Sequence, residues 1–275
     1  MSGLRQEFVQ RSITAIFLSA VVVALVLFSP NLILNTFVFL LSLALFFEWM
    51  KVSKASRKKK IIFLLLFSSL ICCILGFGAL LEPIPIITML GITVWIVIAF
   101  QIFFREGRLS SSFSFTNFWI GLILISTFCL TCFQFVNGSR LFLLIAIFNV
   151  AIFDSGAYII GKNFGKNSFL PELSPNKTIE GLIGGLASSI VFVTLLYILI
   201  EEVSLKASIA LMLSIPFALC GDYFFSFLKR KANIKDTGSI LPGHGGLLDR
   251  VDSHLAAIPM TAFFSHLLYM LGLYF

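Results

Sequence analysis

Apolar runs long enough to cross a lipid bilayer recur from one end of this sequence to the other, and they limit the possible folds more than any other feature. A membrane-spanning helix takes about 17 to 25 predominantly apolar residues. Nine such runs are present, at about residues 12–28, 31–47, 61–81, 84–104, 115–136, 140–160, 179–200, 207–228 and 254–274. The pattern predicts an all-α polytopic membrane protein with about nine transmembrane helices.

The composition supports this class of protein. Hydrophobic residues make up 59% of the 275 residues and charged residues 12%, which is about half the charged fraction of an ordinary soluble domain. A chain with so few charges cannot form a conventional charged surface. The first apolar run follows a short basic segment, but no small-residue cleavage site precedes the second run, so we expect it to remain as an anchor helix.

The basic residues predict the orientation of the helices. With nine spans, alternate connections lie on opposite sides of the membrane, and Lys and Arg accumulate on the cytoplasmic side. All but two of the 20 basic residues fall on one side, and the exceptions are Arg140 and Lys206. We therefore expect a cytoplasmic N-terminus and an external C-terminus in a bacterial inner membrane. The net charge of +7 follows from this asymmetry and does not require a nucleic-acid partner.

Ionisable side chains concentrate in the second half of the chain. Before residue 140 the predicted spans contain almost none, apart from Glu48 at a helix end. Those in or against later spans are Asp154, Glu180 and Asp222. This favours a division into residues 1–139, as scaffold and lipid-facing part, and residues 140–275, as catalytic part. The longest cytoplasmic connections are residues 161–178 and 229–253, and we expect an active site built from these and from helix ends.

Two aspartates lie inside predicted membrane helices. An Asp in hydrocarbon costs about 2.5 to 3.5 kcal/mol on insertion scales, so it needs a partner or a wet cavity. Asp154 and Asp222 both lie about 9 to 10 Å from the cytoplasmic ends of their spans, at 1.5 Å per residue, and could face one shared cavity. Ser226 and Lys229 follow Asp222 on the same helix face, a stripe that suits a metal and a phosphate. An interhelical hydrogen bond is the alternative interpretation.

The connection 161–178 ends in a segment that favours the start of a helix. Ser174 is a good N-cap and Pro175 suits the first helical position, so a helix is predicted to begin here. Its free N–H groups and positive dipole end would bind an anion beside Lys177, and phosphate is the expected ligand. The small residues that follow are interpreted as a face for close helix packing. They are Gly181, Gly184, Gly185 and Ser188.

Residues 226–252 mix charge and glycine more densely than any other part of the chain. Several residues here break regular structure and let the backbone approach a ligand closely. They are Pro242, Gly243, Gly245 and Gly246. Asp249 and Asp252 stand three residues apart at the expected start of the last helix, so their carboxylates can meet at one Mg²⁺. A loop of internal salt bridges is the alternative, and the role of His244 is left open.

The same segment resembles the signature of the phosphatidate cytidylyltransferase family along its full length. The matching residues are Ser226, Lys229, Arg230, Lys235, Asp236, Gly238, Pro242, His244, Gly245, Gly246, Asp249, Arg250 and Asp252. A second stretch also resembles the family, in Asp154-Ser-Gly-Ala-Tyr, Gly161-Lys-Asn-Phe-Gly and Ser174-Pro-Asn-Lys-Thr-x-Glu-Gly. Ser155 and Asn176 stand where Thr and Lys are more usual in the family. The resemblance covers about residues 150–255, and the earlier spans match in hydropathy alone.

The resemblance implies transfer of CMP from CTP to phosphatidate, giving CDP-diacylglycerol and pyrophosphate. The lipid phosphate attacks the α-phosphorus of CTP, so the protein needs no nucleophile and supplies positioning and charge neutralisation. The expected catalytic residues are Asp222, Lys229, Asp249, Arg250 and Asp252. The expected metal ligands are Asp222, Asp249 and Asp252, with Asp154 and Asp236 as further candidates. The expected substrate and phosphate contacts are Ser174, Lys177, Ser226, Arg230, Lys235, His244, Gly245 and Gly246.

The implied cofactor is Mg²⁺, with the number of cations left open. The expected partners are CTP, phosphatidate and the lipid bilayer, without nucleic acid, and a homodimer is left open. The active site is expected to face the cytoplasm. One alternative is a related CTP-dependent membrane lipid kinase or cytidylyltransferase. The other is a secondary transporter with charged midplane helices, against which the cytoplasmic depth of the charges and the glycine-rich loop both argue.

Overall fold

In its described part, the computed structural model consists of α-helices and one short antiparallel hairpin, joined by turns and short connections. The described residues are 19–53, 56, 58–59, 61–62, 64–68, 86–104, 118–171, 174–238 and 245–272. Six helices here are long and apolar enough to cross a membrane, and they confirm six of the predicted runs. They are α2 (Asn31–Val52), α4 (Ile86–Phe104), α5 (Phe118–Gly138), α6 (Arg140–Phe164), α7 (Ile179–Leu199) and α8 (Leu205–Ala232).

The other three predicted spans are not established as crossing helices. Ser19–Phe28 forms a shorter apolar helix, while the start of that run lies outside the described residues. Most of the run 61–81 also lies outside them. The last run falls in α9 (Leu248–Met270), which is not among these six helices, and the end of the run lies outside the described residues. The count of nine spans therefore stays a prediction.

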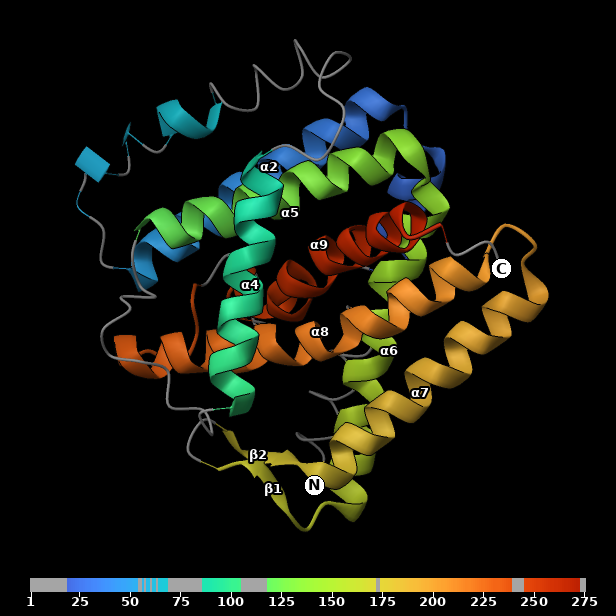
Figure 1. Ribbon diagram of the computed structural model, residues 1–275. Coiled ribbons are helices and arrows are strands. Elements are labelled where there is room, and N and C mark those ends of the chain that lie inside the picture. Colours follow the sequence, from blue (N-terminus) through green and yellow to red (C-terminus); the bar gives the residue numbers. More distant parts are fainter. Residues whose placement is uncertain are drawn as a thin grey trace, which may run out of the picture.

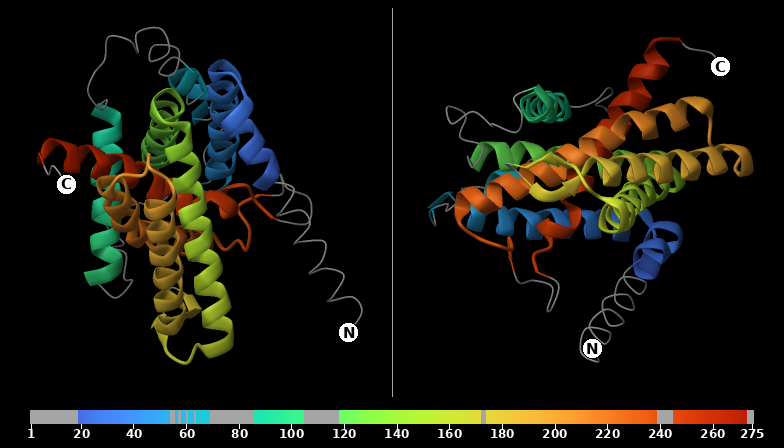
Figure 2. Two further views of the ribbon diagram at one scale, coloured as in Figure 1. Left: turned by 90° about the vertical axis from the view of Figure 1, so that its right-hand side faces the viewer. Right: turned by 90° about the horizontal axis from the view of Figure 1, so that it is seen from below.

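The helices pack as neighbouring pairs (Figure 1). α6 packs along α7, α8 packs along α9, and α2 lies against α5, while α4 contacts both α5 and α8. Figure 2 shows the α6 and α7 pair from two further sides. Side-chain caps begin three of these helices, since Ser139, Thr178 and Ser204 accept hydrogen bonds from the first-turn N–H groups of α6, α7 and α8.

An aromatic core joins the two halves of the sequence. Trp49 of α2 and Phe225 of α8 meet edge to face with ring centroids 5.9 Å apart. Trp95 of α4 and Phe224 of α8 meet in the same way at 5.7 Å. All four side chains are fully buried. Because α2 and α4 come from the N-terminal half and α8 from the C-terminal half, the two predicted parts share one core.

Small residues allow α6 and α7 to approach closely, as the sequence predicted. A Cβ added at Gly185 would lie 2.8 Å from the carbonyl oxygen of Phe153, and one at Gly181 would lie 2.8 Å from that of Ala157. Neither position can therefore take a side chain without a shift of the backbone. This close contact places Asp154 of α6 beside the chain that enters α7.

The connection before α7 contradicts one prediction from the sequence. Residues Ser174–Thr178 form strand β2, which pairs antiparallel with β1 (Ser168–Leu170). Helix α7 thus begins at Ile179, with Thr178 as its N-cap, and the prediction that Ser174 caps this helix was wrong. The reason is pairing across the hairpin, in which Ser174 lies opposite Leu170. Ser174 and Lys177 precede the helix terminus as parts of a strand.

Candidate active site

A cavity of about 760 Å³ lies between α6, α7, α8, the hairpin and the start of α9. Its lining combines charged groups with apolar side chains that include Phe153, Phe169, Leu182 and Leu219. Seven of the residues predicted for the site line it: Asp154, Ser174, Lys177, Asp222, Asp249, Arg250 and Asp252. The fold therefore brings together the two polar stretches that are separate in the sequence.

Three aspartates from three different helices gather in this cavity. Asp154 lies on α6, Asp222 on α8 and Asp252 on α9, and each interacts electrostatically with the others. Gly221 explains how α8 and α9 come so close, because a Cβ at this position would overlap the carbonyl oxygen of Asp252. The next residue of α8 is Asp222, which this contact places beside α9.

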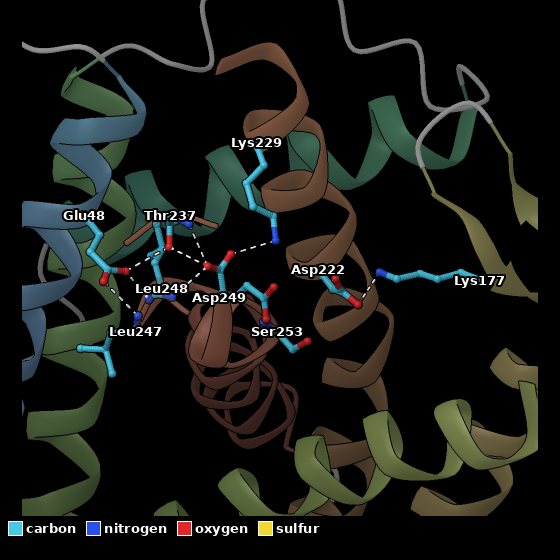
Figure 3. Close-up of polar contacts among 11 residues, drawn as sticks. Glu48, Lys177, Asp222, Lys229, Thr237, Leu247, Leu248, Asp249 and Ser253 are labelled. Atoms are coloured by element: carbon cyan, nitrogen blue, oxygen red, sulfur yellow. Dashed lines mark hydrogen bonds and ion pairs between the residues drawn. The ribbon is translucent and has the colours of Figure 1, made fainter. Parts of the chain in front are cut away.

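Lys177 supplies a positive charge to the aspartate cluster. Its ammonium group pairs with the carboxylate of Asp222 (Figure 3). It also lies 4.2 Å from the ring centroid of Tyr223, a distance at which the face of an aromatic ring attracts a cation. Its charge acts on Asp154 and Asp252 as well. β2 therefore positions one cation against carboxylates from three helices.

Asp249 lies within hydrogen-bond distance of four donor groups. Lys229 Nζ donates to Oδ1 at 2.8 Å. Oδ2 accepts from the backbone N–H and the hydroxyl of Thr237 at 2.8 and 3.0 Å, and from the N–H of Gly246 at 3.3 Å. Burial by itself would raise the pKa of this carboxyl in the predicted connection 229–253, but the bonds from Lys229 and Thr237 lower it overall.

Glu48 also belongs to this region, although we predicted no role for it from the sequence. Its side chain is fully buried near the end of α2. Its carboxylate accepts hydrogen bonds from the N–H groups of Leu247 and Leu248 at 3.0 and 2.8 Å, and from the hydroxyl of Thr237 at 3.0 Å (Figure 3). The sequence did contain one indication of a role, because Glu48 is an acidic residue in the half of the chain whose apolar runs have almost no ionisable residues.

The other predicted residues lie around the cavity or outside the described part. Those that do not line it are Ser226, Lys229, Arg230, Lys235, Asp236, Gly245 and Gly246. Lys229 acts on the cavity through Asp249, and Arg230, Lys235 and Asp236 are exposed beyond it. Gly245 has a φ of 83° and lies close to the carboxylate of Asp236. His244 lies outside the described residues.

The carboxylate oxygens that line the cavity are suitable ligands for a hard cation that binds together with phosphates. Within the described residues, no group of three or more His, Cys, Asp or Glu side chains is arranged to hold a metal ion by itself. Mg²⁺ rarely needs such a cage, because it usually binds one or two carboxylates together with waters and substrate phosphates. Asp222 and Asp252 provide carboxylate oxygens of this kind on the cavity wall.

Comparison with known proteins assigns the chain to a family. Residues 9–268 match the Cytidylyltransferase family. The chain belongs to this family. A phosphatidate cytidylyltransferase of Bacillus subtilis is 43% identical over 113 residues, which are 40% of this chain and 42% of that protein. One from Staphylococcus haemolyticus is 42% identical over 122 residues, 43% of this chain and 46% of that protein. Each alignment spans less than half the length of the relative.

The ion pair between Lys229 and Asp249 leads to a first prediction, on stability. In Lys229→Met the Asp249 carboxylate stays buried but loses its charged donor, since the side chains are only 20% and 11% exposed. A hydrogen bond to a charged group contributes about 1.5 to 3 kcal/mol, so thermal unfolding in detergent should begin at a clearly lower temperature. Lys231→Met, at an exposed position on the same helix, is the matched control.

The pH dependence of this difference has a definite sign. The pKa of Asp249 is lowered in the folded protein, so the stabilisation is present above the pKa of the unfolded carboxyl and is lost as the pH falls through the lowered one. The gap between wild type and Lys229→Met should therefore close at acidic pH. Equal unfolding temperatures for Lys229→Met and Lys231→Met near neutral pH would show that the ion pair contributes nothing.

Proposed function

We propose that this protein is a phosphatidate cytidylyltransferase, which transfers CMP from CTP to phosphatidate and releases pyrophosphate. The observation that carries the proposal is the cavity that joins three aspartates, Lys177 and Arg250 to an apolar wall. An enzyme with these substrates must bind a polyphosphate and an amphiphile in one place. The relatives that bear this name support the same activity.

The reaction needs no nucleophile from the protein. The second pKa of a phosphate monoester is about 6, so phosphatidate is largely dianionic at neutral pH. One of its oxygens forms a bond to the α-phosphorus of CTP, the bond from that phosphorus to the bridging oxygen breaks, and pyrophosphate leaves with the electron pair. Catalysis is then a matter of alignment and of neutralising charge on the phosphates. This agrees with a cavity of carboxylates and cations.

The proposed phosphate ligands are cationic side chains at two sides of the cavity. Lys177 on β2 and Arg250 on α9 both line it. Lys177 pairs with Asp222, and a cation bound by the aspartates would leave this ammonium available for a phosphate. Lys229 bonds to Asp249, so we assign it a supporting role at this acid. Phe153, Phe169 and Leu182 offer an apolar wall for the lipid.

The proposed ligands for Mg²⁺ are Asp222, Asp249 and Asp252, with Asp154 in reserve. Asp222 and Asp252 lie in the same cluster. Asp249 Oδ1 accepts from Lys229 and has a further lone pair, since a carboxylate has about four acceptor sites. When bound, Mg²⁺ would neutralise charge on the phosphates of CTP and favour departure of pyrophosphate. Asp236, which is exposed and outside the cavity lining, is the weakest candidate.

The proposed setting is a bacterial inner membrane, with a cytoplasmic N-terminus and a site that opens to the cytoplasm. The asymmetry of basic residues supports this orientation, and CTP is a cytoplasmic nucleotide. We propose residues 1–139 as the scaffold and residues 140–275 as the part that carries the cavity. The cavity-lining residues fall between Phe153 and Ser253, in agreement with that division.

The orientation gives a second prediction. If nine helices cross the membrane, the C-terminus lies on the external side. A reporter enzyme that is active only outside the cytoplasm should therefore be active when it is fused to the C-terminus. The same reporter fused after Val52, at the end of α2, should be inactive. A C-terminal reporter that works only in the cytoplasm would exclude an odd number of spans.

The activity gives a third prediction. Purified protein with Mg²⁺ should release pyrophosphate from CTP only when phosphatidate is supplied, and the lipid product should carry CMP. Phosphatidate brings an anionic oxygen as its own nucleophile, whereas the hydroxyl of diacylglycerol is neutral and would have to lose a proton, so diacylglycerol should not replace phosphatidate. Equal turnover of CTP with a lipid alcohol, giving CDP and a lipid phosphate, would instead establish the kinase alternative.

A fourth prediction concerns the proposed metal ligands. Asp249→Asn and Asp252→Asn keep the side-chain size but remove the charge, so each should lower the rate at least about 100-fold, which is about 2.7 kcal/mol. Lys51→Ala, an exposed position on α2, should retain normal activity as the control. Rates are measured at limiting Mg²⁺ on protein that elutes as wild type. Near-normal turnover in both Asp variants would rule out this metal site.

A further inference from the structure

We propose that Glu48 is a positioning residue of the active site. In this view the carboxylate of α2 fixes the start of α9 and the neighbouring residues 237–238, and thereby sets the position of Asp249. The inference rests on the function proposed above. It differs from that proposal in giving the N-terminal half of the chain a direct part in the geometry of the site.

Glu48 joins two segments on either side of residues 239–244, which lie outside the described part. Thr237 donates its hydroxyl to Oε2 at 3.0 Å from the first segment. Leu247 and Leu248 donate their N–H groups to Oε1 and Oε2 at 3.0 and 2.8 Å from the second. The three donors lie 189 to 200 residues away in sequence. One carboxylate therefore holds two parts of the signature segment, one before and one after residues 239–244.

The start of α9 depends on this carboxylate for its cap. The N-cap residue, Leu247, makes no side-chain cap hydrogen bond, because a leucine has no oxygen to offer. The first N–H groups of a helix have no partner within the helix, and Glu48 accepts two of them from another helix. Asp249 lies in the same first turn. Two negative charges thus lie at the positive end of the helix dipole, an arrangement that is stabilising.

Two glycines show how tightly the chain is fitted around Glu48. A Cβ added at Gly238 would overlap Oε1 of Glu48. A Cβ added at Gly246 would overlap the hydroxyl of Thr237 and lie 2.7 Å from Oε2 of Glu48. The backbone of both segments therefore approaches the carboxylate more closely than any residue with a side chain allows. This fit is a second reason for glycine in the segment, besides access for a ligand.

Thr237 connects Glu48 to Asp249. Its hydroxyl lies 3.0 Å from Oε2 of Glu48 and 3.0 Å from Oδ2 of Asp249. A hydroxyl has a single proton, so it can donate fully to one carboxylate at a time. The backbone N–H of Thr237 also donates to Asp249 at 2.8 Å. A displacement of Glu48 would therefore move Thr237, and with it two of the four donors that orient Asp249.

The substitution Glu48→Gln tests these hydrogen bonds with almost no change in the volume of the side chain. A glutamine has one acceptor oxygen, and its NH₂ group would face an N–H or hydroxyl donor in place of the second oxygen. At least one of the three hydrogen bonds is lost. Thr237→Val is the second variant, which removes the bridging hydroxyl and keeps the backbone. Ser42→Ala is the control, because Ser42 is buried in α2 and its hydroxyl donates within its own helix.

The first readout is hydrogen exchange of the backbone, which does not depend on activity. We expect the amides of Leu247 and Leu248 to exchange at least about tenfold faster in Glu48→Gln than in wild type. The interior amides of α9 and α8 should keep their rates. Ser42→Ala should exchange as wild type at residues 247–248.

The second readout is the rate of pyrophosphate release as a function of Mg²⁺ and CTP. Glu48→Gln and Thr237→Val should each lower kcat at least about tenfold, which is about 1.4 kcal/mol, and should need more Mg²⁺ for the half-maximal rate. Each rate is normalised to the amount of folded protein, with Ser42→Ala as the reference, so that a lower unfolding temperature does not by itself account for the loss of kcat. The proposal would be overturned if hydrogen exchange became faster throughout the helices and pyrophosphate release fell only in proportion to the amount of folded protein. Glu48 would then stabilise the fold as a whole without positioning the site.

The two proposals can fail separately. Wild-type protein that does not turn over phosphatidate with CTP would refute the proposed function, while the exchange at residues 247–248 would still report whether Glu48 orders this segment. Active wild type with unchanged kcat and Mg²⁺ dependence in both Glu48→Gln and Thr237→Val would refute the positioning role alone.

Discussion

The close approach of α8 and α9 at Gly221 is the contact on which the site depends. A Cβ at that position would overlap the backbone of Asp252, so the two helices meet there through backbone atoms. In a membrane, helices gain little from the hydrophobic effect against each other, and close packing of small residues takes over that role. The glycines of α7 act in the same way against α6. Asp222 and Asp154 each belong to one of these contacts and so reach the same cavity.

The charged side chains at these helix contacts need oppositely charged partners, and the partners come from other helices or strands. Lys177 of β2 pairs with Asp222 of α8, and Lys229 of α8 pairs with Asp249 of α9. A carboxylate left alone away from water would lose its solvation without compensation. In the described part of the chain, Lys177 is the lysine whose charge acts on Asp154, Asp222 and Asp252 together. A divalent cation would offset the remaining negative charge, and this is the physical basis of our proposal that the cluster binds a metal together with phosphates.

The sequence predicted what local pattern can determine. Hydropathy located α4 to α8 to within a few residues, and seven of the residues predicted for the site line the cavity. Local pattern could not show which residues far apart in the sequence contact each other. Ser174 and Pro175 form a good helix start by local rules, yet strand pairing with β1 delays the helix to Ile179. The hydrogen bond from Leu247 to Glu48 spans 199 residues, and no periodicity or spacing can reveal such a contact from one sequence.

The predicted division of the chain into a scaffold and a catalytic part therefore has to be modified, because the two parts are in close contact. The cavity lining comes from the second part, but the aromatic core includes side chains of α2, α4 and α8 together. Without α2, the N–H groups of Leu247 and Leu248 would lose the carboxylate of Glu48 as their acceptor, and each unmet buried group costs about 1 to 3 kcal/mol. The segment that orients Asp249 would have to rearrange to satisfy them. In our proposal the second half of the chain carries the reactive groups, and the first half supplies Glu48 and part of the shared core that fix their positions.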